Sequence, residues 1–251
     1  MPSHITSLRF SRTVVVLMAA GLLLYGCSFG EAEQRRTATA DVTVGEAVTA
    51  VEVKDARRGS IEVAPGTGPG VTVHRTVHYR GDAAPKPGQR VSGGVLTFTE
   101  GCSDPCFVDY RLEVPASATV TLASSSGRIS VTGVAGADLS SSSGDVTADR
   151  TTGPLKVRTS SGSITATALT APTADLQASS GDTRLTFASP PASVTARSSS
   201  GDVILRVPPA PYEITTATGS GTRNTLPSTP TAPSHLNVQT SSGDIHVQST
   251  P

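Results

Sequence analysis

Three groups of residues in this 251-residue chain have types and spacings that could support chemistry. Cys102 and Cys106 flank a Ser-Asp-Pro segment, and His74 and His78 lie four residues apart in an alternating apolar stretch. The third group consists of aspartates that follow a recurring Ser-Ser-Gly phrase: Asp145, Asp182, Asp202 and Asp244. The sequence has no Gly-x-Ser-x-Gly elbow, no His-Glu-x-x-His and no phosphate-binding Gly-rich loop with Lys. It therefore predicts no catalytic residue, and an enzyme is the weakest of the function classes.

A structural disulfide is the favoured interpretation of Cys102 and Cys106. Export would place the chain in an oxidising environment, where nearby cysteines form disulfides. A redox pair normally has two intervening residues, whereas these cysteines have three. Zinc bound by these cysteines together with His74 and His78 is a weaker alternative, since residues four apart on a strand are separated by about 13 Å. We expect neither a metal nor a cofactor.

The recurring aspartates allow two interpretations. Stacked carboxylates can bind Ca²⁺, but calcium-binding β-rolls repeat every nine residues with doubled glycines, a pattern that this chain lacks. Asp and Ser side chains also accept hydrogen bonds from nearby backbone groups in turns. We therefore predict that these aspartates cap turns.

The phrase that precedes them is part of a repeat. Its glycines are 17 to 22 residues apart, and we predict that each occupies a structural turn: Gly127, Gly144, Gly162, Gly181, Gly201, Gly221 and Gly243. Mostly apolar residues stand seven and five positions before each glycine, and two and four positions after it. Alternation with period two indicates a strand on each side of the turn, and glycine can supply the positive φ that such a corner requires.

A unit of about 19 residues with two short strands cannot bury its apolar side chains alone. Stacked copies can do so. We therefore predict an all-β fold, a single-stranded β-solenoid over residues 118–251, in which each repeat forms one turn of the stack, here called a rung. The sixth rung departs from the pattern because Arg223 and Thr225 occupy expected inward positions. We interpret residues 227–234, rich in Pro, Ser and Thr, as an insertion that leaves the stack before the last rung.

Composition agrees with a narrow core and excludes one class of partner. Hydrophobic residues make up 36% of the chain but aromatic residues only 4%, which suits small side chains between closely spaced sheets. Disorder is the competing interpretation, but disordered segments do not keep an apolar register over seven repeats. Twenty basic and 20 acidic residues give zero formal charge, so the chain has no electrostatic signature of nucleic-acid binding.

The N-terminus predicts export. Residues 1–26 combine a basic start with an apolar run ending in Leu24-Tyr25-Gly26-Cys27, which resembles a lipoprotein signal with lipidation at Cys27. A secretory signal with an accidental Cys27, or an uncleaved anchor, are the alternatives. We expect residues 27–46 to form a tether and residues 47–117 a less regular β cap. The predicted location is the outer face of the cell membrane, with a lipid anchor.

The strand start Gly59-Ser60-Ile61-Glu62-Val63, the cysteine hairpin leading into Tyr110-Arg111-Leu112-Glu113-Val114-Pro115, and the Ser-Ser-Gly-Asp-Val rungs together resemble a known family. It is the bacterial putative-adhesin family of β-strand-repeat proteins, and the resemblance covers roughly residues 45–249. The resemblance implies a right-handed β-solenoid, frequent membrane anchoring, and no catalytic residue to carry over.

These observations lead to three functional hypotheses. The first is an exported lipoprotein that presents a solenoid surface to an envelope glycan, wall polymer or protein. The second is a self-assembling or signalling accessory that associates through its solenoid ends. The third, a polysaccharide-active enzyme, is the weakest, because the recurring aspartates stand at corners rather than on one face.

Overall fold

The computed structural model describes residues 35–54, 56–99, 101 and 105–250. The chain divides into two units, residues 1–32 and 33–251, and only the second contains described residues. All regular secondary structure of the described residues is β-strand, in agreement with the all-β prediction. No helix in the described part of the chain is long and apolar enough to cross a membrane.

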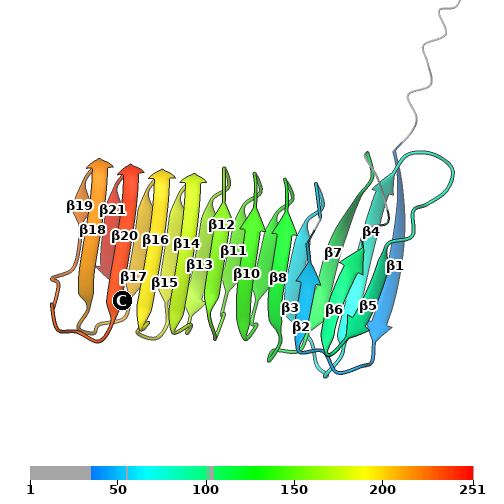
Figure 1. Cartoon of the computed structure of the whole chain (residues 1–251), viewed down its shortest axis with the longest axis horizontal. Helices are drawn as coiled ribbons and strands as arrows, with labels where there is room; N and C mark the ends of the chain where they lie inside the picture. Colours follow the sequence, from blue (N-terminus) through cyan, green and yellow to red (C-terminus); the bar gives the residue numbers. More distant parts are fainter. Residues whose placement is uncertain (1–34, 55, 100, 102–104, 251) are drawn as a thin grey trace, which may run out of the picture. The chain divides into compact units, whose positions relative to one another are not determined.

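The strands form two sheets joined by the corners of the rungs (Figure 1). Sheet A contains, in spatial order, β1 (Arg36–Val44), β4 (Val71–Tyr79), β7 (Phe107–Val114), β3 (Ile61–Pro65), β9 (Ile129–Thr132), β11 (Val146–Asp149), β13 (Ile164–Leu169), β15 (Thr183–Phe187), β17 (Val203–Val207), β21 (Ile245–Ser249) and β19 (Arg223–Asn224). Sheet B contains β18 (Glu213–Ser220), β20 (His235–Ser242), β16 (Ser193–Ser200), β14 (Thr173–Ser180), β12 (Leu155–Thr159), β10 (Gly136–Ser141), β8 (Thr119–Ser124), β2 (Ala50–Val53), β6 (Val95–Thr99) and β5 (Gly88–Ser92).

The repeat forms the predicted solenoid, with equivalent residues of successive rungs in parallel register. Val146 pairs with Ile129 on one side and with Ile164 on the other. These three side chains are at most 1% exposed, and the inward positions of sheet B, such as Leu139 and Val157, are fully buried. The core therefore consists of small apolar side chains from two facing sheets, as the composition predicted.

The order of rungs in space differs from their order in the chain at both ends. The rung of β2 and β3 lies between the rung of β6 and β7 and the rung of β8 and β9, although it precedes both in sequence. At the other end, β20 and β21 lie between the fifth rung (β16 and β17) and the sixth (β18 and β19). Residues 227–234 form no strand, as predicted, but the last rung does not follow the sixth at the end of the stack. The sixth rung forms the outer end of the stack, and the last rung of the chain pairs on both of its sides.

The outermost rung is polar where inner rungs are apolar. Arg223 is exposed, and Thr216 is only half-buried, although both occupy positions that are inward in other rungs. The backbone edge of β18 is also covered: the Ile214 amide donates to Ser228 Oγ at 2.9 Å, and Arg223 Nη1 donates to the Thr216 carbonyl at 3.4 Å. These contacts protect an otherwise free strand edge.

The N-terminal region extends both sheets with antiparallel strands. Residues 36–44, predicted to belong to a tether, instead form β1, which pairs along its whole length with β4. Strand β4 pairs antiparallel with β7, and β5 pairs antiparallel with β6. Residues 47–117, predicted as a β cap, contain these antiparallel strands and also supply one rung of the parallel stack, formed by β2 and β3.

The corner glycines form a column in which the backbones of successive rungs approach closely. A Cβ atom on Gly144 would lie 2.0 Å from the Gly127 carbonyl oxygen, and one on Gly162 would lie 2.1 Å from that of Gly144. Positive φ was the expected reason for glycine, but only the later corners adopt it: Gly181, Gly201, Gly221 and Gly243. In the first three corners the close approach of the neighbouring backbone alone requires glycine.

Candidate functional site

The recurring aspartates form hydrogen bonds between neighbouring rungs. The Ser163 amide donates to Asp145 Oδ1 at 3.0 Å, and the Asp202 amide donates to Asp182 Oδ1 at 3.1 Å. Asp202 Oδ1 in turn accepts from the Asp244 amide at 2.8 Å. The aspartates thus accept from backbone amides at the corners, as predicted, but each amide belongs to a neighbouring rung rather than to the aspartate's own turn.

Asp244 forms the corresponding hydrogen bond to the outermost rung. Asp244 Oδ1 accepts a hydrogen bond from the Thr222 amide at 2.7 Å, and this bond holds the pKa of Asp244 below its usual value. No group of three or more His, Cys, Asp or Glu side chains within the described residues is arranged to hold a metal ion. The carboxylates are therefore occupied with backbone amides rather than gathered around a cation.

A row of side chains runs along the outer face of sheet B, beside the corners. In each of its rungs the row takes the residue four positions before the corner glycine, and the register aligns these residues strand by strand. We call this set the basic row: Ala123, Ser140, Arg158, Gln177, Arg197 and Gln239. It holds two arginines and no acidic residue. The next outward position along the strands carries serines, such as Ser160 and Ser199.

One end of the basic row opens into a groove of about 490 Å³ near the outermost rungs. Gln177, Arg197 and Gln239 come from three adjacent strands and line the groove, together with Ser199 and Ser241. Ser198 also lines it; this residue is only 8% exposed, and its hydroxyl has no hydrogen-bond partner. The groove thus combines a guanidinium, two amides and several hydroxyls, which are donors suited to oxygen-rich ligands.

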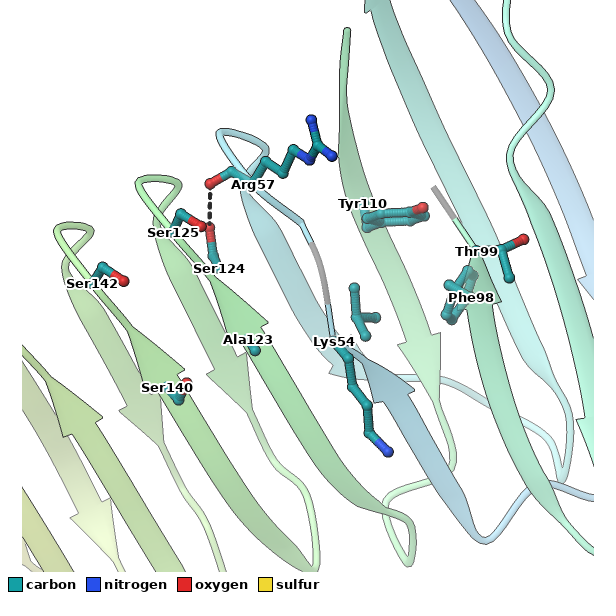
Figure 2. A pocket seen from close by; sticks show the side chains of 11 residues that line it. Lys54, Arg57, Phe98, Thr99, Tyr110, Ala123, Ser124, Ser125, Ser140 and Ser142 are labelled. Carbon is teal, nitrogen blue, oxygen red and sulfur yellow. Dashed lines mark hydrogen bonds between the residues drawn. The ribbon is translucent and has the colours of Figure 1, made fainter. Parts of the chain in front are cut away.

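The other end of the row lies beside a larger cavity of about 780 Å³ (Figure 2). Lys54 and Arg57 come from the first corner, Phe98 and Tyr110 from β6 and β7, and Ser140 from the basic row. The two aromatic rings meet edge to face with centroids 5.0 Å apart. Lys54 Nζ lies 2.6 Å from Glu52 Oε2, so this cation has a carboxylate partner.

The histidines form separate pairs with carboxylates on the outer face of sheet A. His74 Nδ1 lies 2.9 Å from Asp41 Oδ1, and His78 Nε2 lies 2.8 Å from Asp109 Oδ2. Ser60 Oγ donates to Asp109 Oδ1 at 2.7 Å. The carboxylate therefore stands between hydroxyl and imidazole, whereas nucleophilic catalysis needs the imidazole to contact the hydroxyl. This arrangement is structural.

The remaining predicted sites lie wholly or partly outside the described residues. Cys27 and Cys102 are outside, so lipidation and the disulfide stay predictions. Cys106 is described and is buried beside β7. The basic row was not predicted from the sequence, although its signal is present. The prediction used only the inward positions around each corner glycine, whereas the row occupies the outward position four residues before it.

Comparison with known proteins adds a family and a fold. A model of the Toastrack DUF4097 family matches residues 55–248. No curated protein matches the chain. Among solved structures, a putative adhesin from Bacteroides fragilis has a TM-score of 0.51 and 16% identity, over 87% of this chain and 99% of that chain.

Two further solved structures have lower scores. A putative adhesin from Parabacteroides distasonis has a TM-score of 0.47 and 16% identity, over 86% of this chain and 97% of that chain. A putative cell adhesion protein from Clostridium sporogenes has a TM-score of 0.41 and 12% identity, over 86% of this chain and 100% of that chain. At 16% identity, the Bacteroides fragilis structure shares the fold with this chain, and its description carries no function over.

Proposed function

This chain belongs to the Toastrack DUF4097 family, and on that basis we propose that it is a non-enzymatic, adhesin-like binding protein that presents the outer face of sheet B to an envelope polymer. The Bacteroides fragilis structure, which shares this fold, is described as a putative adhesin, and that description motivates the proposed role. A surface for binding requires only side chains in a fixed arrangement, and a stack of parallel strands provides that arrangement over a long distance.

One observation carries the proposal: the grooves on the outer face of sheet B cross several strands. A groove of about 570 Å³ is lined by residues of β8, β10, β12, β14 and β16, including Thr121, Lys156 and Thr195. Because its lining residues come from successive rungs, it runs along the stack rather than along a strand. An extended polymer can follow such a groove and meet the same kind of position once per rung, about every 4.8 Å.

The N-terminal sequence supplies the location in this proposal. Lipidation of Cys27 after removal of residues 1–26 would hold the protein on the outer face of the cell membrane, since several acyl chains together give stable anchoring. The solenoid would then be presented to polymers of the envelope outside the cell. A disulfide between Cys102 and Cys106 suits the same oxidising location.

Self-assembly is the second candidate, and the outermost rung argues against it at that end. Stacking of copies needs a free strand edge and an apolar face, whereas β18 is covered by Ser228 and Arg223 and its rung is polar. The observations favour contact through a sheet face over contact through this solenoid end.

Binding of residues 33–251 to insoluble cell-envelope material tests the proposal, because this unit contains all the buried core residues of the described part of the chain. We expect retention of the wild-type domain. We also expect Thr195→Trp, which fills the groove, to weaken retention about tenfold, since tryptophan occupies the space that a bound polymer needs. Thr165→Trp is the matched control, because Thr165 lies on the outer face of sheet A. Absence of retention, or loss caused only by Thr165→Trp, would contradict the proposed function.

A further inference from the structure

We propose that the basic row binds a linear anionic polymer, one that carries carboxylates or phosphodiesters along its length, with Arg158 and Arg197 as the contacts to its charged groups. This inference rests on the proposed function and names its ligand. It concerns the outer face of sheet B beside the corners, where neighbouring rungs align Arg158, Gln177, Arg197 and Gln239.

The first support is that these two arginines are not engaged with carboxylates. Four of the eight basic side chains of residues 118–251 are so engaged: Arg128 with Asp145, Arg150 with Asp149, Lys156 with Asp138 and Arg184 with Asp182. Among the described residues, no ion pair involves Arg158 or Arg197, and both side chains are exposed. Their charge is therefore available to an external anion.

The second support is the spacing of the row. Arg158 pairs in register with Gln177, which pairs with Arg197, so the two guanidinium groups belong to strands two places apart, about 10 Å. A guanidinium presents a planar fork of donors that matches a carboxylate or a phosphate oxygen pair. The amides of Gln177 and Gln239 can bond hydroxyls between the charges. A polymer with an anionic group on every second unit of about 5 Å would match this spacing.

The third support is the groove at one end of the row. Arg197 lies between Gln177 and Gln239 in a hollow of about 490 Å³. Ser199 and Ser241 also line this hollow. Both residues are exposed, and their hydroxyls can bond oxygen atoms of a ligand that follows the row.

The opposite side of the corners carries charges of both signs. Asp145, Asp182, Asp202 and Asp244 follow their glycines on the sheet A side, and Arg128 and Arg184 lie close to two of them. The basic row has two arginines and no carboxylate among its own members, so we expect a polyanion to contact the sheet B side of the serine corners. Most of the attraction is between solvent-exposed charges, and salt therefore weakens it.

The experiment measures binding of residues 33–251 to three soluble probes: polygalacturonate, poly(glycerol phosphate) and the neutral polymer dextran. We expect one or both anionic probes to bind, dextran not to bind, and binding to weaken between 50 and 500 mM salt by about tenfold. Arg158→Gln with Arg197→Gln should weaken binding about tenfold or more. The matched control, Arg128→Gln with Arg206→Gln, removes the same charge from the corner before β9 and from β17 of sheet A, and should leave binding unchanged.

The two anionic probes separate the possible sources of the charge, because one carries carboxylates and the other phosphodiesters. Equal binding of dextran, or equal effects of the two double variants, would overturn the inference. If envelope material is retained but neither salt nor the Arg158 and Arg197 substitutions affect that retention, the proposed function stands and this inference fails. If envelope material is not retained at all, the proposed function itself fails.

Discussion

The corner glycines are the residues on which the stack depends most directly. Their column brings the carbonyl of one rung to within about 2 Å of where the next rung's Cβ would lie, as between Gly127 and Gly144. Such a distance is far shorter than any van der Waals contact, and the neighbouring atom is backbone, which cannot rotate away. A side chain at these positions must therefore separate two rungs.

The residue-scale prediction is that Gly144→Ala destabilises the domain by about 2 kcal/mol or more, because the added methyl group overlaps the Gly127 carbonyl. Chemical denaturation followed by circular dichroism measures the change in the free energy of unfolding. Gly68→Ala is the control, since no atom lies within 4 Å of its Cβ position. Equal stability of the two variants would mean that neighbouring corners can move apart without loss of unfolding free energy. The close approach of the backbones would then not require glycine at these positions.

At the scale of the elements, β18 and β19 are the outermost strands at one end of the described stack. A polar rung at this position removes the apolar surface that would attract another copy. Ser228 and Arg223 additionally occupy backbone groups of β18 that would otherwise be available to a new strand. Natural β-proteins use such devices against edge-to-edge association.

We predict that Ser228→Ala combined with Arg223→Ala promotes self-association, because the two side-chain hydrogen bonds to the backbone edge of β18 are removed. Sedimentation velocity over a range of protein concentrations should detect oligomers in this variant and a monomer in the wild type. Arg206→Ala removes a charge from the outer face of sheet A and is the control for charge alone. A variant that stays monomeric at the highest concentration would indicate that the polar rung closes this end by itself.

The repeat could be predicted from sequence because it is a local pattern. Period-two alternation around each glycine identified the strands, and inward residues such as Val157 and Ile164 are at most 1% exposed. The basic row could have been predicted from the same alignment, since its members share one offset from the glycine. Strand β1 was missed because Arg36–Val44 alternates weakly, and its burial pattern confirms that it is mostly exposed.

The order of the rungs could not be predicted, because neighbouring rungs have nearly the same pattern. A prediction from sequence alone places each repeat of a solenoid next to the repeat that precedes it in the chain. The actual order depends on the contacts of particular rungs: the polar sixth rung is tolerated at the outer end, and the apolar seventh rung, with Leu236 and Val238, fills the position beside β16. Burial of apolar side chains therefore decided the order, and chain connectivity accommodated it through the loop after β19.

At the scale of the whole described unit, this exchange of rungs places both the first parallel rung and the last rung in sequence between neighbouring rungs. Strands β2 and β3 have partners on both sides, and so do β20 and β21. In a repeat protein whose rungs follow sequence order, the last repeat has one neighbour and opens first. Here the last repeat is internal, so the first rung to open at this end should be the sixth.

Hydrogen exchange of two matched amides tests this order. The Glu213 amide bonds the Ser234 carbonyl across the outermost interface, and the His235 amide bonds the Ala192 carbonyl one rung further in. We predict that the His235 amide exchanges at least about tenfold more slowly than the Glu213 amide, because two rungs must open before the His235 hydrogen bond breaks. This order is expected although His235 is nearer the end of the chain. The central Val146 amide, bonded to the Ser163 carbonyl, gives the reference for global opening. Faster exchange at His235 than at Glu213 would mean that the chain opens from its terminus in sequence order, and the inserted last rung would then add no protection against opening.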